Sequence, residues 1–328
     1  MEAKIKRIGV LTSGGDSPGM NAAIRAVIRT AAYHNIESYG IRHGYSGLLN
    51  GEILKMEARD VGETLQKGGT ILQTARCLEF KEKEGVMKGV AMAKRYGLDG
   101  IVVIGGDGSF RGARELTRAG IPTVAIPGTI DNDIACSDYT IGFDTCLETV
   151  KDSIDKLRDT SSSHDRCSIV EVMGRNAGYI AVHASIACGA EVVLIPEREV
   201  DFDRDVISPI LNGKARGKHH IIVIVAEGVS KRVMPVQEMA KVIEDATGIE
   251  ARSTVIGHVQ RGGSPTVRDR VVASEMGAKA VELLLEGKSN RIVRMKDNKI
   301  SDVDIEEGLN MTKDVEDYLI ELSKKLSV

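Results

Sequence analysis

Three short apolar runs, each followed at once by a loop that contains glycine, constrain the fold of this chain more than any other feature of the sequence. The runs cover residues 8–11, 100–104 and 123–126. The middle run is apolar without interruption from Ile101 to Ile104, which is typical of a strand buried on both faces of a parallel sheet. Because ligands of open α/β sheets bind outside the carboxyl ends of the strands, we expect the three loops to face one cleft.

The pattern between and beyond these runs predicts an α/β fold. Helices are predicted over about residues 22–32, 60–66, 84–96 and 147–157, with a turn at 44–47 and a polar loop over 158–166. Further strands are predicted over residues 168–172, 191–195, 220–225 and 254–256. Strands that alternate with helices are typical of α/β sheets, and a chain of 328 residues is long enough for two lobes.

The composition disfavours several classes of protein. A formal charge of −3 and a pI near 6.2 argue against a broad nucleic-acid surface, and a chain with no Trp and four Phe has few platforms for stacked bases. Five cysteines without a C-x-x-C pair suit neither a disulfide framework nor a zinc site, so we expect reduced thiols. With no signal-peptide pattern and no long apolar segment, we expect a cytoplasmic protein that binds no membrane and no nucleic acid.

The loop over residues 12–21 is a candidate anion site. Gly14 and Gly15 stand between a predicted strand and a predicted helix, where the backbone can approach an anion and the start of the helix adds partial positive charge. The loop is not a G-x-x-x-x-G-K-[ST] motif, and a tight turn without a ligand is the alternative. Arg25 and Arg29 share a helix face, either as a solvated stripe or as half of an anion site.

Two further loops carry carboxylates. In the loop over residues 105–109, which opens a helix that runs to about Ala119, the glycines leave room for phosphates and Asp107 can hold Mg²⁺; the alternative is a glycine-rich turn with a helix cap. In the loop over residues 127–133, Asp131 and Asp133 can divide labour, one facing a reacting hydroxyl and the other a cation or its neighbour. The alternative there is a turn in which Asp and Asn bond their own backbone.

Loop arginines point to phosphate ligands. Arginine offers a planar fork that matches phosphate oxygens, and several forks in one region need anions between them. Glu227 and His258 could bind sugar hydroxyls, although His258 is equally well explained as a structural hydrogen bonder. The arginines concerned are Arg76, Arg166, Arg175, Arg252 and Arg261.

Five motifs in this order resemble the bacterial ATP-dependent 6-phosphofructokinase family. They are G-V-L-T-S-G-G-D-S-P-G-M-N from Gly9, G-G-D-G-S from Gly105, P-G-T-I-D-N-D from Pro127, E-V-M-G-R from Glu171 and G-H-V-Q-R-G-G-S-P from Gly257. The resemblance implies an α/β fold of two doubly wound, Rossmann-like three-layer domains with mostly parallel sheets, between which the chain crosses more than once. The expected domains are residues 1–142 with 259–306, which bind ATP, and residues 143–258 with 307–328, which bind fructose 6-phosphate.

The resemblance also implies a reaction, in which the γ-phosphoryl of ATP moves to the 1-hydroxyl of fructose 6-phosphate. Asp131 would act as the base, supported by Asp133 and Thr129, while Arg76 and Arg175 would neutralise charge on the transferring group. Asp107 would hold the Mg²⁺ that accompanies ATP. The remaining nucleotide residues would be Gly15, Cys77, Gly106, Gly108 and Ser109.

Further sites follow from the same resemblance. Fructose 6-phosphate would also contact Ile130, Met173, Gly174, Glu227, His258, Val259, Gln260 and Arg261, with Arg166 and Arg252 supplied by a neighbouring subunit of a homotetramer. ADP or phosphoenolpyruvate would act as allosteric effectors at Arg25, Arg29, Arg158, Gly189, Glu191, Arg216, Lys218, His219 and His220. Ala58 stands where some relatives have an effector-binding arginine.

Three alternatives remain beside this function. Pyrophosphate-dependent relatives carry Asp at the position of Gly108 and Lys at that of Gly128, and the glycines here favour ATP. NAD kinases and lipid kinases share G-G-D-G but have no use for the paired Asp loop together with M-G-R. A catalytically silent regulatory subunit is disfavoured because Asp107, Asp131 and Arg175 are all present.

Overall fold

The computed structural model describes residues 5–327, which fall into two compact units. The first unit comprises Met1–Ile130, Ile134–Thr145 and Arg261–Lys313, and the second comprises Asp131–Asp133, Cys146–Gln260 and Asp314–Val328. The chain therefore passes from one unit to the other more than once, as the resemblance implies. The boundaries expected for the two ligand-binding domains stay a prediction. Among the described residues no helix is both long and apolar enough to cross a membrane.

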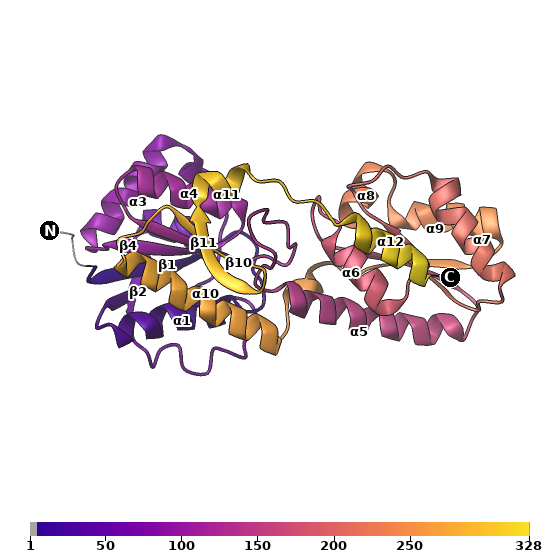
Figure 1. Ribbon diagram of the computed structural model, residues 1–328, viewed down its shortest axis with the longest axis horizontal. Coiled ribbons are helices and arrows are strands. Elements are labelled where there is room, and N and C mark those ends of the chain that lie inside the picture. Colours follow the sequence, from indigo (N-terminus) through magenta and orange to yellow (C-terminus); the bar gives the residue numbers. More distant parts are fainter. Residues whose placement is uncertain (1–4, 328) are drawn as a thin grey trace. The chain divides into compact units, whose positions relative to one another are not determined.

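The first unit is built on a seven-stranded sheet in the order β11-β10-β5-β4-β1-β2-β3 (Figure 1). β4 lies between β1 and β5 and is parallel to both, with Gly105 aligned with Ser13 on one side and with Pro127 on the other. The three glycine-bearing loops thus leave the sheet at the same end, and that they face one cleft stays a prediction. The strands are β1 (Arg7–Ser13), β2 (Glu37–Ile41), β3 (Ile53–Met56), β4 (Gly100–Gly105), β5 (Thr123–Pro127), β10 (Arg291–Lys296) and β11 (Lys299–Asp304).

Helices cover both faces of this sheet. On one face α1 and α10 pack closely (Figure 1), because Gly277 has no side chain: a Cβ there would lie 2.7 Å from the carbonyl oxygen of Ala23. On the other face α2, α3 and α4 bury an apolar core that includes Leu11, Val103 and Phe110. The helices are α1 (Met20–Tyr33), α2 (Gly44–Asn50), η1 (Glu79–Lys81), α3 (Lys83–Arg95), α4 (Asp107–Arg118), α10 (Val267–Leu285) and α11 (Ile305–Asn310).

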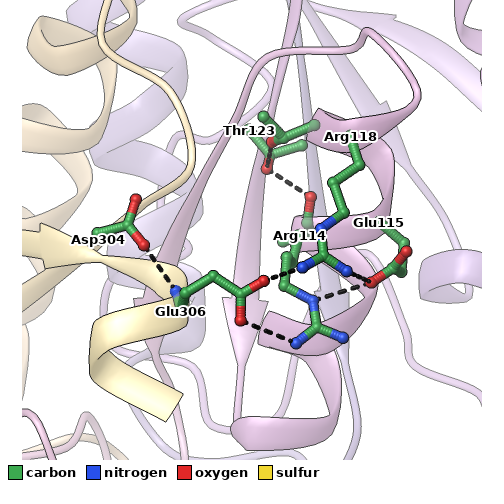
Figure 2. A network of polar contacts seen from close by, with 8 residues as sticks. Arg114, Glu115, Arg118, Thr123, Asp304 and Glu306 are labelled. Carbon is green, nitrogen blue, oxygen red and sulfur yellow. Dashed lines mark hydrogen bonds and ion pairs between the residues drawn. The ribbon is translucent and has the colours of Figure 1, made fainter. Parts of the chain in front are cut away.

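A polar network fastens α4 to α11 (Figure 2). Glu306 pairs with Arg118 and with Arg114, whose Nη1 lies 3.2 Å from a carboxylate oxygen of Glu306. Both arginines also contact Glu115, at 2.8 and 3.0 Å, and the backbone N–H of Glu306 donates to Asp304 at 2.8 Å. The helix that begins with Asp107 is thereby held at its carboxyl end by charged side chains and along its length by the apolar core.

The second unit is built on a four-stranded parallel sheet in the order β7-β8-β6-β9. β8 is buried at every residue, and α9 covers one face together with Val206, Ile207 and Ile210. The strands are β6 (Cys167–Val172), β7 (Val192–Leu194), β8 (Ile221–Ala226) and β9 (Ala251–Val255). The helices are α5 (Phe143–Ser162), which begins in the first unit, α6 (Tyr179–Cys188), η2 (Asp203–Ile207), α7 (Ser208–Ala215), α8 (Glu227–Arg232), α9 (Val236–Thr247), η3 (Gly257–Arg261) and α12 (Asp317–Leu326).

Three local predictions were wrong. Residues 60–66 form successive turns instead of a helix, because Glu63 takes a left-handed conformation with φ of 52° that interrupts helical hydrogen bonding. The turn expected at 44–47 is the start of α2. The loop expected from Arg158 begins only after Ser162, so Arg158 lies on α5. The five cysteines form no disulfide, as expected, and all five lie within the described residues.

Candidate active site

The loop after β1 has a backbone that only glycine tolerates. Gly14 has φ of +90°, and its carbonyl oxygen accepts a hydrogen bond of 2.8 Å from the hydroxyl of Thr74. A Cβ on Gly15 would lie 2.7 Å from Nη1 of Arg261, so the guanidinium group rests directly on the loop backbone. Nε of Arg261 is buried and makes no hydrogen bond to any residue in the described part of the chain. The loop therefore presents backbone and a guanidinium group together, both suited to an anion.

The loop after β4 is fixed by close backbone contacts and opens on one side. A Cβ on Gly105 would lie 2.3 Å from the carbonyl oxygen of Ser13, while the hydroxyl of Ser109 donates to that same oxygen at 3.1 Å. The hydroxyl of Tyr45 donates to the carbonyl oxygen of Ser109 at 2.6 Å. By contrast, a Cβ on Gly106 or on Gly108 would meet no atom within 4 Å. The first turn of α4 is held in place and has free space beside it.

Asp107 is the first residue of α4 and adjoins this free space. No group of three or more His, Cys, Asp or Glu side chains among residues 5–327 forms a cage for a metal ion. Mg²⁺ seldom needs such a cage, because it is commonly bound by one or two carboxylates together with water and substrate phosphates. One carboxylate beside open, glycine-lined space therefore fits a Mg²⁺ ion that arrives with a nucleotide.

The two carboxylates of the loop after β5 differ in burial. Asp131 is only 4% exposed, whereas Asp133 is half-buried. Between them Asn132 has φ of 52°, a left-handed backbone conformation that asparagine adopts more readily than most residues. A carboxylate oxygen of Asp133 lies 4.0 Å from Nη1 of Arg175, within the second unit. The paired Asp loop therefore already approaches one of the predicted phosphate arginines.

The turn after β6 is shaped by Glu227. Gly174 has φ of 136° and Arg175 has φ of 54°, and the backbone N–H of Arg175 donates to Glu227 at 2.7 Å. Burial raises the pKa of Glu227, but hydrogen bonds from Lys231 and from the Arg175 backbone outweigh burial, so the pKa lies below its ordinary value. Glu227 is ionised at neutral pH and holds the M-G-R turn, while the Arg175 side chain is exposed.

The helical turn η3 divides its predicted substrate residues between surface and interior. His258 and Val259 are exposed. Gln260 is fully buried: its Oε1 accepts the backbone N–H of Met173 at 3.2 Å, and its Nε2 donates to the carbonyl oxygen of Gly257 at 3.0 Å. The side chain of Gln260 therefore braces the turn beside Met173.

Arg166 and Arg252 come together on one carboxylate. Nε of Arg166 lies 2.7 Å from Oε2 of Glu250, and Arg252 pairs with the other carboxylate oxygen. Of the remaining predicted residues, Arg76 is exposed, and Cys77 is half-buried against the core of the first unit. Two cations already share one anionic partner, which is the kind of fork that a phosphate group can occupy.

The predicted effector residues occupy both units. Arg25 and Arg29 lie on α1 in the first unit, where burial and secondly the charge of Arg29 lower the pKa of Arg25. The others belong to the second unit, where Gly189, Arg216 and His219 are exposed. A pocket of about 250 Å³ there is lined by Asp165, Arg166, Lys214, Gly217, Lys218, His219, His220, Ile221 and Ile249.

Within the second unit four of the effector residues form two pairs, Glu191 with Lys218 and Arg158 with His220. Glu191 has a buried side chain, and its two oxygens accept from Nζ of Lys218 at 3.0 Å and from the backbone N–H of Ile222 at 2.7 Å. Nη1 of Arg158 lies 2.7 Å from Nε2 of His220, and its Nη2 donates to the carbonyl oxygen of Cys188. Lys218 thus pairs with a buried carboxylate, and Arg158 pairs with His220.

Sequence reasoning missed the residues that hold these loops in place. Tyr45, which fixes the first turn of α4, stood in what was predicted to be a turn. Asp269, in the first turn of α10, accepts four hydrogen bonds from residues near the Asp131 loop and had no motif to mark it. The signal that could have found Asp269 is an acidic residue in a segment that is otherwise apolar on its buried side.

Comparisons with known proteins agree with this geometry. The family model described as Phosphofructokinase matches residues 7–284. An ATP-dependent 6-phosphofructokinase from Bacillus cereus is 56% identical over 324 residues, which are 99% of this chain and all of that protein. A protein of the same name from Bacillus anthracis is equally similar over the same lengths. The chain belongs to the phosphofructokinase family, and the resemblance seen in the sequence is confirmed.

Solved structures show the same fold. The phosphofructokinase of Pichia pastoris superposes with a TM-score of 0.89 at 34% identity, covering 100% of this chain and 40% of that chain. For the Saccharomyces cerevisiae enzyme the TM-score is 0.86 at 35% identity, covering 98% of this chain and 48% of that one. The chain spans less than half the length of these yeast chains, but all of the Bacillus proteins.

Proposed function

We propose that this chain is an ATP-dependent 6-phosphofructokinase. It transfers the γ-phosphoryl group of ATP to the 1-hydroxyl of fructose 6-phosphate, which gives fructose 1,6-bisphosphate and is the committed step of glycolysis. The observation that carries this proposal is the 56% identity over the full length of a Bacillus protein of that name. The glycine loops after β1 and β4 and the paired Asp loop after β5 supply a chemical basis for it.

Asp131 is proposed as the base that accepts the proton of the sugar hydroxyl. Burial in a loop that follows a central strand suits this role, since a rigidly placed carboxylate abstracts a proton efficiently only at hydrogen-bonding distance. Thr129 binds near the transferring group, Ile130 lines the substrate, and Asp133 orients Arg175. Arg175 and Arg76, both exposed, are available to neutralise charge on the equatorial oxygens of the phosphoryl group.

The nucleotide is assigned to the first unit. Gly15 and Gly106 bring backbone close to its phosphates, Gly108 and Ser109 open and fix the first turn of α4, and Cys77 lines the same side. Asp107 holds Mg²⁺ in this assignment. The cation would offset the negative charge of the nucleotide phosphates. The open space beside Gly106 and Gly108 supports the choice of a nucleotide over a smaller donor.

Fructose 6-phosphate is assigned mainly to residues of the second unit. Met173, Gly174 and Glu227 form the turn that faces the sugar, with His258, Val259 and the brace Gln260 from η3. Arg261 contributes its unpaired Nε to phosphate. We propose that Arg166 and Arg252 act on the 6-phosphate bound by a neighbouring subunit of a homotetramer, with the phosphate taking the place that Glu250 holds on Arg166.

Regulation is assigned to the set formed by Arg158, Gly189, Glu191, Arg216, Lys218, His219 and His220, joined by Arg25 and Arg29 of another subunit. ADP or phosphoenolpyruvate would bind there. Arg166 lines the same pocket as Lys218 and His220, and its carbonyl oxygen accepts the backbone N–H of Ile221. An anion at the effector residues therefore acts beside a substrate arginine, which supports a coupling between the two sites. A cytoplasmic location stays an expectation.

A coupled assay of ADP production from ATP and fructose 6-phosphate tests the proposal. We expect turnover that needs Mg²⁺ and both substrates, and we expect pyrophosphate to replace ATP poorly. Comparable turnover with pyrophosphate would make the chain a pyrophosphate-dependent enzyme. Turnover with NAD or a lipid in place of the sugar phosphate would point to the other kinase classes, and no turnover with any acceptor would point to a silent regulatory subunit.

A further inference from the structure

Asp269 is a fully buried carboxylate at the start of α10 that accepts four hydrogen bonds. Its Oδ1 accepts from the hydroxyl of Tyr139 at 2.6 Å and from the backbone N–H of Gly142 at 2.7 Å. Its Oδ2 accepts from the backbone N–H of Thr145 at 2.9 Å and from the hydroxyl of Thr145 at 2.5 Å. With 0% exposure, the group has no solvent to replace these partners.

The segment that Asp269 holds supports the loop of the proposed base. The backbone N–H of Ile141 donates to the carbonyl oxygen of Pro127 at 3.0 Å, and Gly128 and Ile141 form a β-bridge. The hydroxyl of Thr140 donates to the carbonyl oxygen of Thr129 at 2.7 Å. Residues 139–142 therefore pack directly against residues 127–129. Thr129 lies two residues before Asp131 in the chain.

The same carboxylate also lies against the loop after β1. A Cβ on Gly19 would lie 2.6 Å from Ile141 and 3.5 Å from Cβ of Asp269, and a Cβ on Gly142 would lie 2.5 Å from Ser17. These close approaches mean that a small movement of residues 139–142 must move the glycine loop as well.

The third loop linked to Asp269 is the one that carries Arg261. Thr266 caps α10, since its hydroxyl accepts the backbone N–H of Asp269 at 3.2 Å. The backbone N–H of Thr266 in turn donates to the hydroxyl of Thr145 at 3.0 Å. One buried group thus joins three segments of the first unit, which are residues 127–129, the loop after β1 and the segment that leads from Arg261 into α10.

We propose that Asp269 is a positioning residue for phosphoryl transfer, which fixes residues 127–129, where the loop of Asp131 begins, against the loops that carry Gly15 and Arg261. This rests on the proposed function for the roles of those three residues. Asp269 itself touches neither substrate and acts only through its hydrogen bonds to residues 139–145. The residue must be a carboxylate, because each of its oxygens faces one backbone N–H that cannot turn away. An asparagine would set its amide N–H₂ against one of them.

The test is Asp269→Asn, which keeps the size of the side chain and removes half of its acceptor capacity. We expect kcat to fall by roughly 10²-fold, the loss that follows when reacting groups are displaced by about 1 Å. The Kd values of ATP and fructose 6-phosphate should change less than about fivefold, since their contacts remain. Asp302→Asn is the matched control: it also removes a carboxylate from a hydrogen bond in the first unit, at 2.6 Å from Arg291, but on the hairpin β10–β11.

A double-mutant cycle separates positioning from a loss of stability. Thr140→Val cuts the hydrogen bond to Thr129 without touching Asp269, and we expect it to lower kcat by roughly tenfold, as suits one hydrogen bond in the support of a reacting group. Both substitutions break the same chain of hydrogen bonds between Asp269 and the loop of Asp131. The kcat of the double variant should therefore be scarcely lower than that of Asp269→Asn alone. If Asp269→Asn does not fold, Tyr139→Phe replaces it in the cycle. Additive losses would overturn the proposal, as would a kcat within about threefold of wild type in the folded variant.

Hydrogen–deuterium exchange distinguishes this proposal from the proposed function. In Asp269→Asn, the amides of residues 127–142 should exchange faster than in wild type, while those of β2 and β3 should not. If the wild-type chain turned over no substrate while exchange in residues 127–142 still rose in Asp269→Asn, the proposed function would be wrong. The structural support that Asp269 gives to this segment would still be confirmed. Unchanged exchange in this segment, with an active wild type, would overturn the support alone.

Discussion

The glycine loops of the first unit and the effector set of the second unit are both assigned to phosphate ligands, yet they are built in opposite ways. The loops after β1 and β4 present backbone, and their shape depends on contacts that only glycine permits, such as Gly105 against Ser13. The effector set presents long charged side chains. Its one buried carboxylate, Glu191, forms an ion pair with Lys218 and accepts a hydrogen bond from a backbone N–H. The first site depends on geometry and the second on charge.

This difference decides what a substitution should do in each region. In the glycine loops, which act through their geometry, a substitution at a rigid position should lower the rate of the chemical step, because reacting groups must lie within tenths of an ångström of their places. In the effector set, which acts through charge, a substitution should alter the affinity for an effector and leave the rate of the chemical step nearly unchanged. The predictions below are ordered from the largest expected effect to the smallest, and each strengthens or breaks this contrast.

The largest effect is expected from Asp131→Ala in the loop after β5. Removing the proposed base should lower kcat by roughly 10²–10⁴-fold and leave the binding of fructose 6-phosphate near normal, because a general base contributes to the transition state and little to the ground state. Steady-state kinetics with a separate binding titration measures both. Asp138→Ala serves as the control, since Asp138 is exposed and pairs with Lys296. A near-wild-type kcat in Asp131→Ala would show that the base is another group.

Gly108→Asp tests the geometry of the nucleotide loop with one added charge. Two like charges about 6 Å apart repel by about 3 kcal/mol at an effective dielectric of about 20, so ATP should bind roughly 10²-fold more weakly. A Cβ on Gly108 meets no atom within 4 Å, so Gly108→Ala is a control that should bind ATP nearly as wild type does. If both variants lose ATP equally, steric exclusion and not charge governs this position.

Much of this contrast could be predicted from the sequence, for a physical reason. The central residues of β1, β4 and β5 are buried on both faces, so these strands appear in the sequence as short runs with few polar residues, and the glycines that follow them stand out. Asp269 could not be found in this way, because its partners lie 124 to 130 residues away along the chain. The helix predicted over residues 60–66 failed because nothing local marks Glu63 as left-handed.

The roles of the site residues are a different matter from the fold. The motifs around Asp107, Asp131 and Arg175 carry a chemical pattern that can be read without coordinates. The inward turn of the Gln260 side chain toward Met173 depends on how η3 meets β6. Burial of a polar side chain is decided by packing between elements, so the sequence did not reveal that Gln260 braces the backbone, and its substrate contact stays a prediction.

The effector set should act on substrate affinity and leave the chemical step intact. Phosphoenolpyruvate is expected to raise the half-saturating concentration of fructose 6-phosphate by about 5–150-fold, the usual range of coupling between two sites. In Arg216→Ala, which removes one exposed cation, the rise should shrink at least threefold, about what one charge contributes near a surface, while kcat stays as in wild type. Unchanged saturation curves with both phosphoenolpyruvate and ADP, with the oligomer intact, would sink the effector site.

The smallest effect is expected from the protonation of His220. Arginine only donates hydrogen bonds, so Nε2 of His220 must accept from Arg158 and the ring is neutral. Burial, and after it the charge of Arg158, lowers the pKa of His220 below its ordinary value of 6.5, with Glu191 opposing and Lys218 and His219 adding to the decrease. In the protein without effector, the stability that neutral His220 contributes is complete above pH 6.5 and is lost as the pH falls through the lowered pKa.

A bound anion reverses the electrostatic part of that shift, because a negative charge beside His220 favours the protonated ring. Phosphoenolpyruvate should therefore bind more tightly as the pH falls from 8 to 6, beyond the change caused by titration of the ligand itself. Titrations with wild type and with His220→Gln isolate this part, since the ligand titrates identically in both. Parallel curves for the two proteins would show that His220 stays neutral with the anion bound, and the effector set would then depend on arginine and lysine alone.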